Sequence, residues 1–393
     1  MKKVAIWCAF FAFFLLQGVP FCGAAEPLAE SQSTTSQETL PEAEAMRDAF
    51  DGFLGSVPPE VADLLPEGFF SQDMGAVGEA VREQSSLSAI LSAIGRATGL
   101  AIGDNLALLA RLCGALILSA VLRGLFGESG ASQAFSFCAT LTMVVVIVFA
   151  QRSRFFEISA LFETVKSLSL SLLPFMGALY AMGGNVAAAA ANHGVMTAFL
   201  SLLETVIGST ALPVAGICLS LGLLDALSNR VSLRSLGALI KRTYTWTFSL
   251  LMLLLCGVLG LQTTLAKGSD GLAMRTLRFA TGSFLPVVGG SVSEALRTVA
   301  GSVGYLRSVA GGAALLVLFF AFLPTFVSVL LNRIVFLLCA SVAKMLRCDG
   351  EEKILSELSS IYGYFMAVIA SLFVMMTFSL TLLARCATAG GGL

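Results

Sequence analysis

Few residues in this chain have the types and spacing that catalysis requires. The sequence contains one histidine, His193, among small and polar residues, so it offers neither an HExxH zinc motif nor a serine, histidine and aspartate set with alternatives. It also lacks the GxxxxGK[ST] loop that holds nucleotide phosphates. The cysteines lie mostly in apolar segments and never in CxxC spacing, which is typical of small buried hydrophobes. We predict that the protein is not an enzyme and has no catalytic residue, cofactor or metal site.

Glu204 lies in the middle of the apolar stretch "TAFLSLLETVIGSTALP". A carboxylate inside a membrane needs a partner or a proton, and such acids often have a functional role. Glu204 is therefore a candidate intramembrane charge. The alternative is that it faces a water-filled crevice, or contacts another subunit, without taking part in transport.

Proline and glycine mark places where helices could break. Leu-Pro dipeptides recur with separations of 39 and 38 residues, and the two pairs are offset by 112 and 111 residues. Each pair precedes a charged amphipathic stretch, "NRVSLRSLGALIKR" or "KMLRCDGEEKILSEL", and then an uninterrupted apolar run. Two related halves with broken helices would give this order, and so would a chance alignment of prolines. Glycine pairs beside these prolines permit sharp turns or close helix packing. The candidate pore or helix-break residues are Pro174, Gly183, Gly184, Pro213, Pro286, Gly289, Gly290 and Pro324.

These residues lie in segments suited to crossing a membrane. Thr243–Leu265 and Tyr362–Ala384 each hold 23 residues without a charge, enough to cross a hydrocarbon layer about 30 Å thick. The chain is 56% hydrophobic and 12% charged, with a mean hydropathy of +0.87. We predict an all-α, polytopic helical membrane protein with about six or seven spans, several broken by proline or glycine, plus amphipathic helices. The multi-pass domain, 134–393, would contain Ala134–Ala150, Ser167–Gly183, Val195–Leu227, Thr243–Leu265, Gly311–Leu331, Tyr362–Ala384 and the shorter Phe279–Val292.

Residues 84–133 have an ambiguous pattern. Leu106–Leu122 is apolar, but Arg111 interrupts it and Asp104 precedes it. An arginine at the bilayer centre costs at least about 2.5–3.5 kcal/mol. We therefore favour an amphipathic helical region here and keep a membrane span as the alternative.

The N-terminus resembles a secretory signal. Lys2 and Lys3 precede the apolar run Val4–Leu16, and small residues end at Ala25, so we predict a cleaved signal peptide at 1–25; an uncleaved first span is the alternative. Residues 26–83 carry a net charge of −11, against +8 for residues 84–393. This acidic segment is predicted to be external, disordered at first and then folded into short helices separated by prolines, lying on a partner or on the membrane surface.

The C-terminus is predicted to lie outside the cytoplasm. Phe279–Val292 has 14 residues, which rise only about 21 Å as a helix, so we expect it to be re-entrant and to leave six spans. Basic residues then number 11 inside and six outside, in line with the positive-inside rule. If the segment crosses, the halves are inverted and Leu393 is cytoplasmic.

Met274–Gly311, "MRTLRFATGSFLPVVGGSVSEALRTVAGSVGYLRSVAG", resembles the most recognisable block of the stage III sporulation protein AE family of endospore-forming Firmicutes. The flanking order is similar too, with "LLPFMGALYAMGG" and "LPVAGICLSLGLLDALSNR" preceding it. The resemblance covers roughly residues 85–385. Arg297 stands where an acidic residue is expected, and Arg307 where a lysine is usual.

The resemblance implies a membrane subunit of a channel-like sporulation complex. That complex links mother cell and forespore, supports forespore development, and lies in the mother-cell membrane around the forespore. This member would be permease-like. Its partners would be other membrane proteins of the complex and the lipid bilayer, with no nucleic acid. The alternative function is a freestanding secondary transporter of a small solute that binds near Glu204.

Overall fold

A computed structural model describes residues 41–70, 74–126, 130–181, 209–227 and 289–388, together with 233, 235–251 and three residues just beyond. All regular structure in these ranges is helical. Signal residues 1–25 lie outside them, as do Glu204, His193 and Phe279–Val288. The elements are α2 (Pro41–Gly55), α3 (Pro59–Ala62), the 3-10 helix η1 (Glu67–Phe70), α4 (Met74–Gln84), α5 (Leu87–Phe126), α6 (Gly130–Ala181), α8 (Leu212–Leu227), α10 (Gly289–Met345) and α11 (Asp349–Thr388). A further helix covers 235–251.

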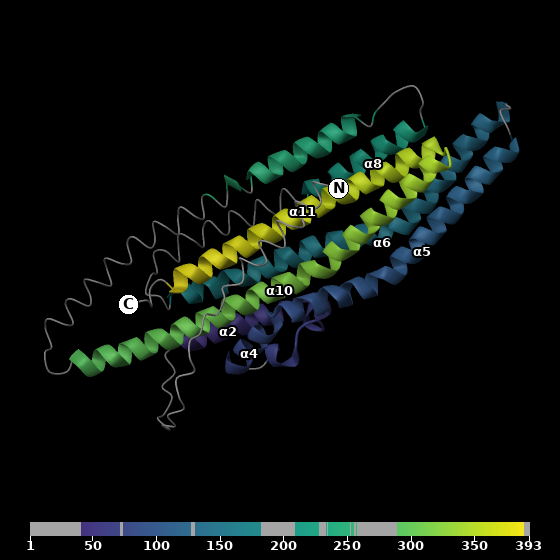
Figure 1. Cartoon of the computed structure of the whole chain (residues 1–393). Helices are drawn as coiled ribbons and strands as arrows, with labels where there is room; N and C mark the ends of the chain where they lie inside the picture. The colour runs from purple at the N-terminus through teal and green to yellow at the C-terminus, as the bar shows by residue number, and fades with distance from the viewer. Residues whose placement is uncertain are drawn as a thin grey trace.

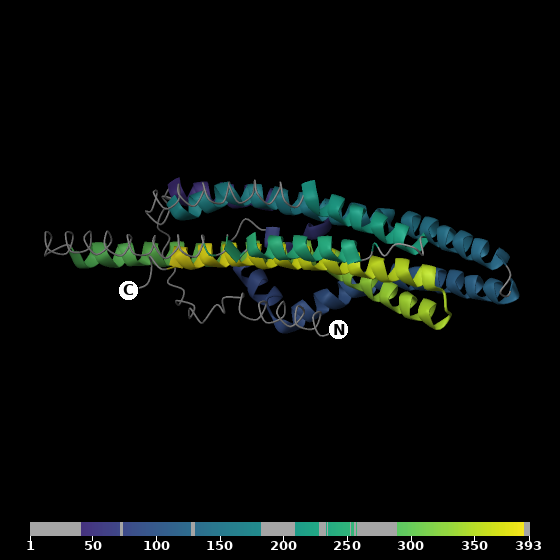
Figure 2. The ribbon, with the colours of Figure 1, turned by 90° about the horizontal axis from the view of Figure 1, so that it is seen from above.

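The long helices form three hairpins that point the same way. α5 pairs with α6, α8 with the helix 235–251, and α10 with α11. In each hairpin the end of the first helix and the start of the second lie toward the right-hand end of the molecule (Figures 1 and 2). The far end of α11 lies toward the opposite end. In the described part of the chain the three hairpins therefore run in the same direction.

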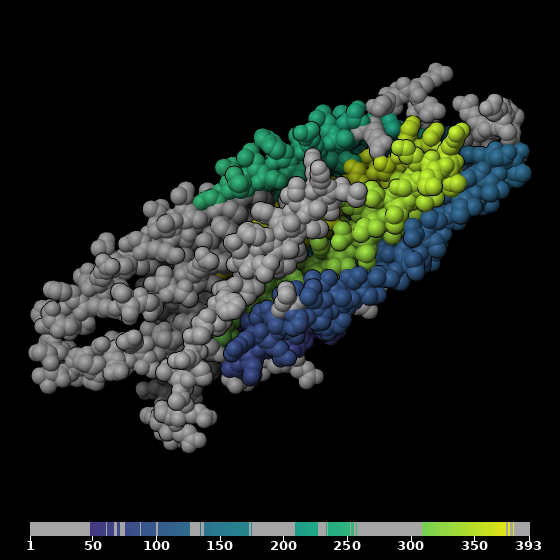
Figure 3. All heavy atoms as spheres, in the orientation of Figure 1, coloured from purple at the N-terminus to yellow at the C-terminus, as the bar shows by residue number. Residues whose placement is uncertain are grey.

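α10 and α11 form the centre of the bundle. α10 packs on α5, α6 and α4, while α11 packs on α6 and α8. Figure 3 shows both helices between α5 on one edge and the helix 235–251 on the other.

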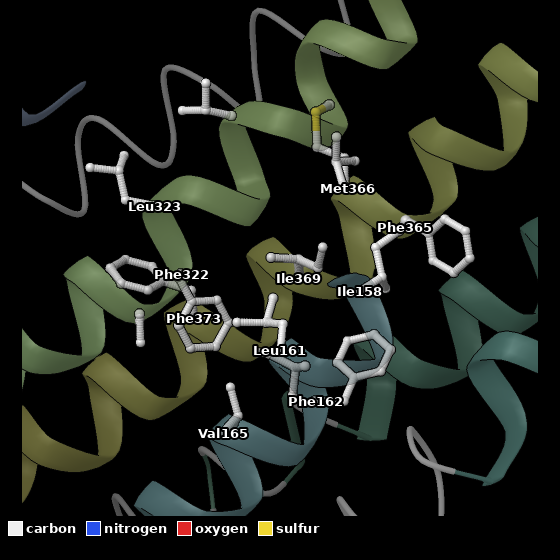
Figure 4. Packing of buried hydrophobic residues seen from close by; sticks show 14 of the residues in the cluster. Ile158, Leu161, Phe162, Val165, Phe322, Leu323, Phe365, Met366, Ile369 and Phe373 are labelled. Carbon is white, nitrogen blue, oxygen red and sulfur yellow. The ribbon is translucent and has the colours of Figure 1, made fainter. Parts of the chain in front are cut away.

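The apolar core between α6, α10 and α11 is built from large side chains. In Figure 4, Phe365, Ile369 and Phe373 of α11 lie opposite one face of α6. The Phe322 and Phe373 rings meet edge to face at 5.5 Å, a geometry that contributes about 0.5–1.5 kcal/mol beyond burial. The α6 side chains on this face are Ile158, Leu161, Phe162 and Val165, all buried.

Five helices in the described residues are long and apolar enough to cross a membrane. They are Ser88–Leu125, Phe137–Leu172, Ser209–Ala226, Val309–Met345 and Asp349–Val374. The all-α, multi-pass fold class is thereby confirmed. Ser88–Leu125 covers most of the ambiguous region 84–133, so by length and composition the membrane span that we kept as the alternative qualifies there.

The structure corrects one predicted boundary. Ala134–Ala150 and Ser167–Gly183 were expected to be separate spans, but the first lies within α6 and α6 continues through the second as far as Ala181. The charged stretch between them buries Ile158, Leu161 and Val165 at helical spacing and exposes Arg152, Phe156 and Glu163. An amphipathic pattern of this kind continues a helix, so the chain does not reverse there.

The prolines also differ from expectation. Pro174 lies inside α6 and Pro324 inside α10, and both helices continue past them. Each proline removes one backbone hydrogen bond. Membrane helices tolerate this loss where neighbouring helices satisfy the freed backbone groups. Neither helix therefore ends at its proline, and the candidate role of the two prolines in a pore stays a prediction.

The acidic segment folds into short helices, as its prolines predicted, although α2 already begins at Pro41. These helices lie on the bundle itself. Phe50 and Phe53 are buried, and α2 packs on α6 while α4 packs on α10. Ser56 Oγ donates a 2.7 Å hydrogen bond to Ser171 Oγ of α6. The segment therefore covers part of α6 and α10.

Candidate functional site

One ion pair of the described residues has both partners buried, and it joins two hairpins. Lys241, in the helix 235–251, donates to Glu357 Oε1 of α11, and their side chains are only 7% and 4% exposed. Lys241 Nζ also donates a 2.8 Å hydrogen bond to Ser360 Oγ. A buried pair is tolerated when each charge is matched and hydrogen-bonded, and these contacts meet that requirement for the lysine.

Two glycines make room for the Glu357 side chain. A Cβ added to Gly222 of α8 would lie 3.1 Å from Glu357 Cβ and closer still to Glu357 Cγ, so any side chain there would collide. Gly237 is also near, at 3.7 Å from Glu357 Oε1 for an added Cβ. Glu357 is thus clamped between α8 and the helix 235–251.

The seam around this pair has a regular spacing on both helices of the α8 hairpin. In the helix 235–251 one face carries Gly237, Lys241, Tyr244 and Phe248, at intervals of four, three and four residues. Tyr244 is half-buried and the other three are buried. α8 buries residues at the same kind of spacing, and this pattern places them on one face toward a partner helix. The set is Ala211, immediately before α8, and Ala215, Cys218, Gly222 and Asp225 within it.

Tyrosines continue the seam away from the ion pair. The Tyr364 hydroxyl of α11 donates to the Ala211 carbonyl at 3.2 Å. Its ring meets Tyr244 at 5.4 Å, edge to face, and the Tyr244 hydroxyl shares a 2.8 Å hydrogen bond with Thr210. These polar contacts fix the register of α11 against the α8 hairpin.

A second ion pair ties the tip of the α10–α11 hairpin to α5. Arg123 donates to Glu351 at 2.5 and 2.6 Å, and Ser119 Oγ donates to Glu351 Oε1 at 2.9 Å. Gly350 fits against α6, because a Cβ there would lie 2.5 Å from Thr140 Oγ1. Burial raises the pKa of the nearby Cys348 thiol, while Arg123 acts in the opposite direction. The tip therefore contacts both helices of the first hairpin.

A third group, which we name the central polar layer, joins α5, α6, α10 and α11. Arg154 donates to Glu157 at 2.9 and 3.0 Å, to Asp104 at 3.1 Å and to Ser328 at 3.3 Å. On the same side of α6, Gln151 accepts a hydrogen bond from the Tyr362 hydroxyl of α11. The layer contains Asp104, Asn105, Gln151, Arg154, Glu157, Ser328, Asn332 and Tyr362.

The described residues contain no group of three or more His, Cys, Asp or Glu side chains able to hold a metal. What the arrangement offers is charge pairing and hydrogen bonding inside a helical bundle. Such groups are expensive in an apolar medium, so they hold helices in register or line a polar route.

The sequence-predicted site residues are not gathered at this pair. Pro174, Pro213 and Pro324 are exposed on three different helices, and Gly289 and Gly290 are the first residues of α10. Gly183, Gly184, Pro286 and Glu204 lie outside the described residues. Their roles as pore or intramembrane sites stay predictions.

Sequence reasoning missed Lys241 and Glu357, although the signal was present. Both lie in the charged amphipathic stretches that follow the Leu-Pro pairs. Each occupies a position that helical spacing assigns to a buried face. A lysine and a glutamate at such positions indicate mutual pairing.

The fold and these contacts define a class: a polytopic helical membrane protein whose hairpins are joined by buried charged groups. Within that class, the chain belongs to the stage III sporulation protein AE family, whose model matches residues 76–387. It is similar to Stage III sporulation protein AE of Bacillus subtilis (strain 168), with 24% identity over 389 residues that cover 96% of each chain. No solved structure matches it. The family resemblance of the sequence is confirmed.

Proposed function

We propose that this protein is the permease-like membrane subunit of a channel-like complex that links mother cell and forespore and supports forespore development. The observation that carries the proposal is the family match over residues 76–387, which implies a role in stage III of sporulation. In this proposal the protein lies in the mother-cell membrane around the forespore. Its partners are other membrane proteins of the complex.

The internal polar contacts support the permease-like part of the proposal. Lys241–Glu357 and the central polar layer place charges and amides among helices that are otherwise apolar. Polar groups inside membrane bundles mark pathways for solutes or ions in many transport proteins. The parallel hairpins supply the rigid walls such a pathway needs.

The test is complementation in an endospore-forming host whose own family member has been deleted. Expression of the full chain should restore a late forespore reporter and heat-resistant spores, and membrane cross-linking should recover other sporulation membrane proteins. The Lys241→Met/Glu357→Gln variant, in which no unpaired charge remains, should fail at membrane levels close to those of the parent. Glu163→Gln, at an exposed carboxylate of α6 outside both polar groups, is the matched control and should complement. The proposal would be refuted if the deletion host made normal spores without the chain. It would also be refuted if the chain restored sporulation without cross-linking to other sporulation membrane proteins.

The buried Lys241–Glu357 pair also favours a second candidate, a freestanding secondary transporter. Charge pairs inside a bundle are common where an ion or a proton is coupled to a solute. Purified protein in liposomes distinguishes the two functions. Saturable solute uptake by the protein alone supports the transporter, whereas uptake that requires co-reconstituted partners supports the complex subunit.

A further inference from the structure

Three amide side chains lie inside the bundle with a polar atom that has no hydrogen-bond partner in the described part of the chain. They are Asn105 of α5, Gln151 of α6 and Asn332 of α10, which are 4%, 2% and 1% exposed. The atoms concerned are Asn105 Oδ1, Gln151 Nε2 and Asn332 Oδ1. A buried polar atom without a hydrogen bond lowers the stability of the folded state. Three such atoms in one bundle call for a ligand that satisfies them.

All three amides belong to the level of the bundle that Arg154 organises. Asn105 follows Asp104, whose carboxylate accepts from Arg154. Gln151 precedes Arg154 by three residues, a rise of about 4.5 Å along α6. Asn332 follows Ser328, the α10 partner of Arg154, by four residues and therefore lies on the same face of α10.

Tyr362 brings the amides of α6 and α10 to the same region. Its hydroxyl donates to Gln151 Oε1, and its ring stacks on Phe336 at 5.5 Å. Phe336 lies one helical turn beyond Asn332 on the same face of α10. Gln151 Nε2 and Asn332 Oδ1 consequently face one region between α6, α10 and α11.

The chemistry of the three atoms identifies the ligand as water. Gln151 Nε2 is a donor, whereas Asn105 Oδ1 and Asn332 Oδ1 are acceptors. Water both donates and accepts, and buried waters in proteins typically make about three hydrogen bonds to such groups.

We propose that the central polar layer is a water-binding site, in which Gln151, Asn332 and Asn105 hold ordered water at the centre of the bundle. The layer also reaches the surface of the bundle, because the side chains of Asp104 and Glu157 are 77% and 42% exposed. In this proposal the ordered water lies beside the buried Tyr362 hydroxyl. This inference does not depend on the proposed function.

The test is X-ray radiolytic footprinting of the full chain in lipid nanodiscs. Hydroxyl radicals formed from bound water oxidise the side chains beside it, even buried ones. Phe336 and Phe322 are a matched pair, since both are phenylalanines of α10 and are 0% and 1% exposed. Phe336 and Tyr362 should be oxidised several-fold faster than Phe322 and should incorporate the isotope from H₂¹⁸O.

The Gln151→Leu/Asn332→Leu variant should remove this difference, whereas Ser341→Ala, at an exposed serine of α10, should retain it. The comparison of Phe336 with Phe322 in the unaltered protein is decisive even if the double variant does not fold. Equally slow oxidation of the two phenylalanines would overturn the water site. Retention of fast oxidation in a folded double variant would overturn the role of the amides.

Discussion

The Lys241–Glu357 pair predicts that losing either partner is far more damaging than losing both. Lys241→Met removes the ammonium but keeps an apolar stem, and Glu357→Gln keeps the side-chain shape that fits against Gly222. Each single variant leaves a charge in a site where the two side chains are only 7% and 4% exposed. Breaking a buried pair in this way costs about 3–5 kcal/mol. This corresponds to about two to four orders of magnitude in the folding equilibrium.

The measurement is reversible unfolding of the purified protein in a mild detergent, followed by circular dichroism. The Lys241→Met/Glu357→Gln double variant should recover most of the loss, because no unpaired charge remains. Asp104→Asn is the control: it weakens an exposed ion pair of the kind that contributes about 0–1 kcal/mol. Single variants within about 1 kcal/mol of the parent, or a double variant that loses the sum of both, would refute the reasoning.

Three further predictions follow from other contacts. The C-terminus should be external, because the basic residues Arg123, Lys344 and Arg347 mark the shared end of the hairpins as cytoplasmic and α11 ends away from it. A reporter that fluoresces only in the cytoplasm should therefore stay dark when fused after Leu393, and a bright reporter would contradict this topology. Gly350→Ala should lower the free energy of unfolding by about 1–3 kcal/mol, because the added Cβ would collide with Thr140. Gly114→Ala is the control, because its added Cβ meets open space, and equal thermal midpoints for the two variants would count against the packing of α11 on α6. Mild copper-catalysed oxidation should join Cys113 to Cys339, because α5 packs on α10 and the two thiols are neighbours, while the exposed Cys138 should not pair with either. Peptide mapping without that disulfide would argue against α5 lying on α10 as described.

The helical membrane fold and the short acidic helices were accessible from the sequence because they depend on local properties. Apolar runs of 23 residues predict helices that cross a bilayer. Prolines 58, 59 and 66 separate α2, α3 and η1, as expected from the missing backbone donor. These signals need no knowledge of which helices meet.

The charged contacts were harder to predict because they join distant segments. Lys241 and Glu357 are 116 residues apart, and a charge beside an apolar run indicates a membrane boundary as readily as a buried pair. Arg154 likewise lies between the predicted spans Ala134–Ala150 and Ser167–Gly183, where a charge indicates a connection as readily as a buried contact. The apolar spacing of Ile158, Leu161 and Val165 was the signal that α6 continues there.

The length of the central helices sets how far this protein reaches. α10 has 57 residues and is therefore about 86 Å long, nearly three times the hydrocarbon thickness of about 30 Å. Standing upright in the bilayer, it carries more than about 50 Å of continuous helix beyond the lipid tails. Contacts with a neighbouring membrane or protein would then occur well away from the lipid surface. They would occur on α10, a long helix that α11 stiffens by packing along it. Such a rod transmits a displacement at one end directly to the other.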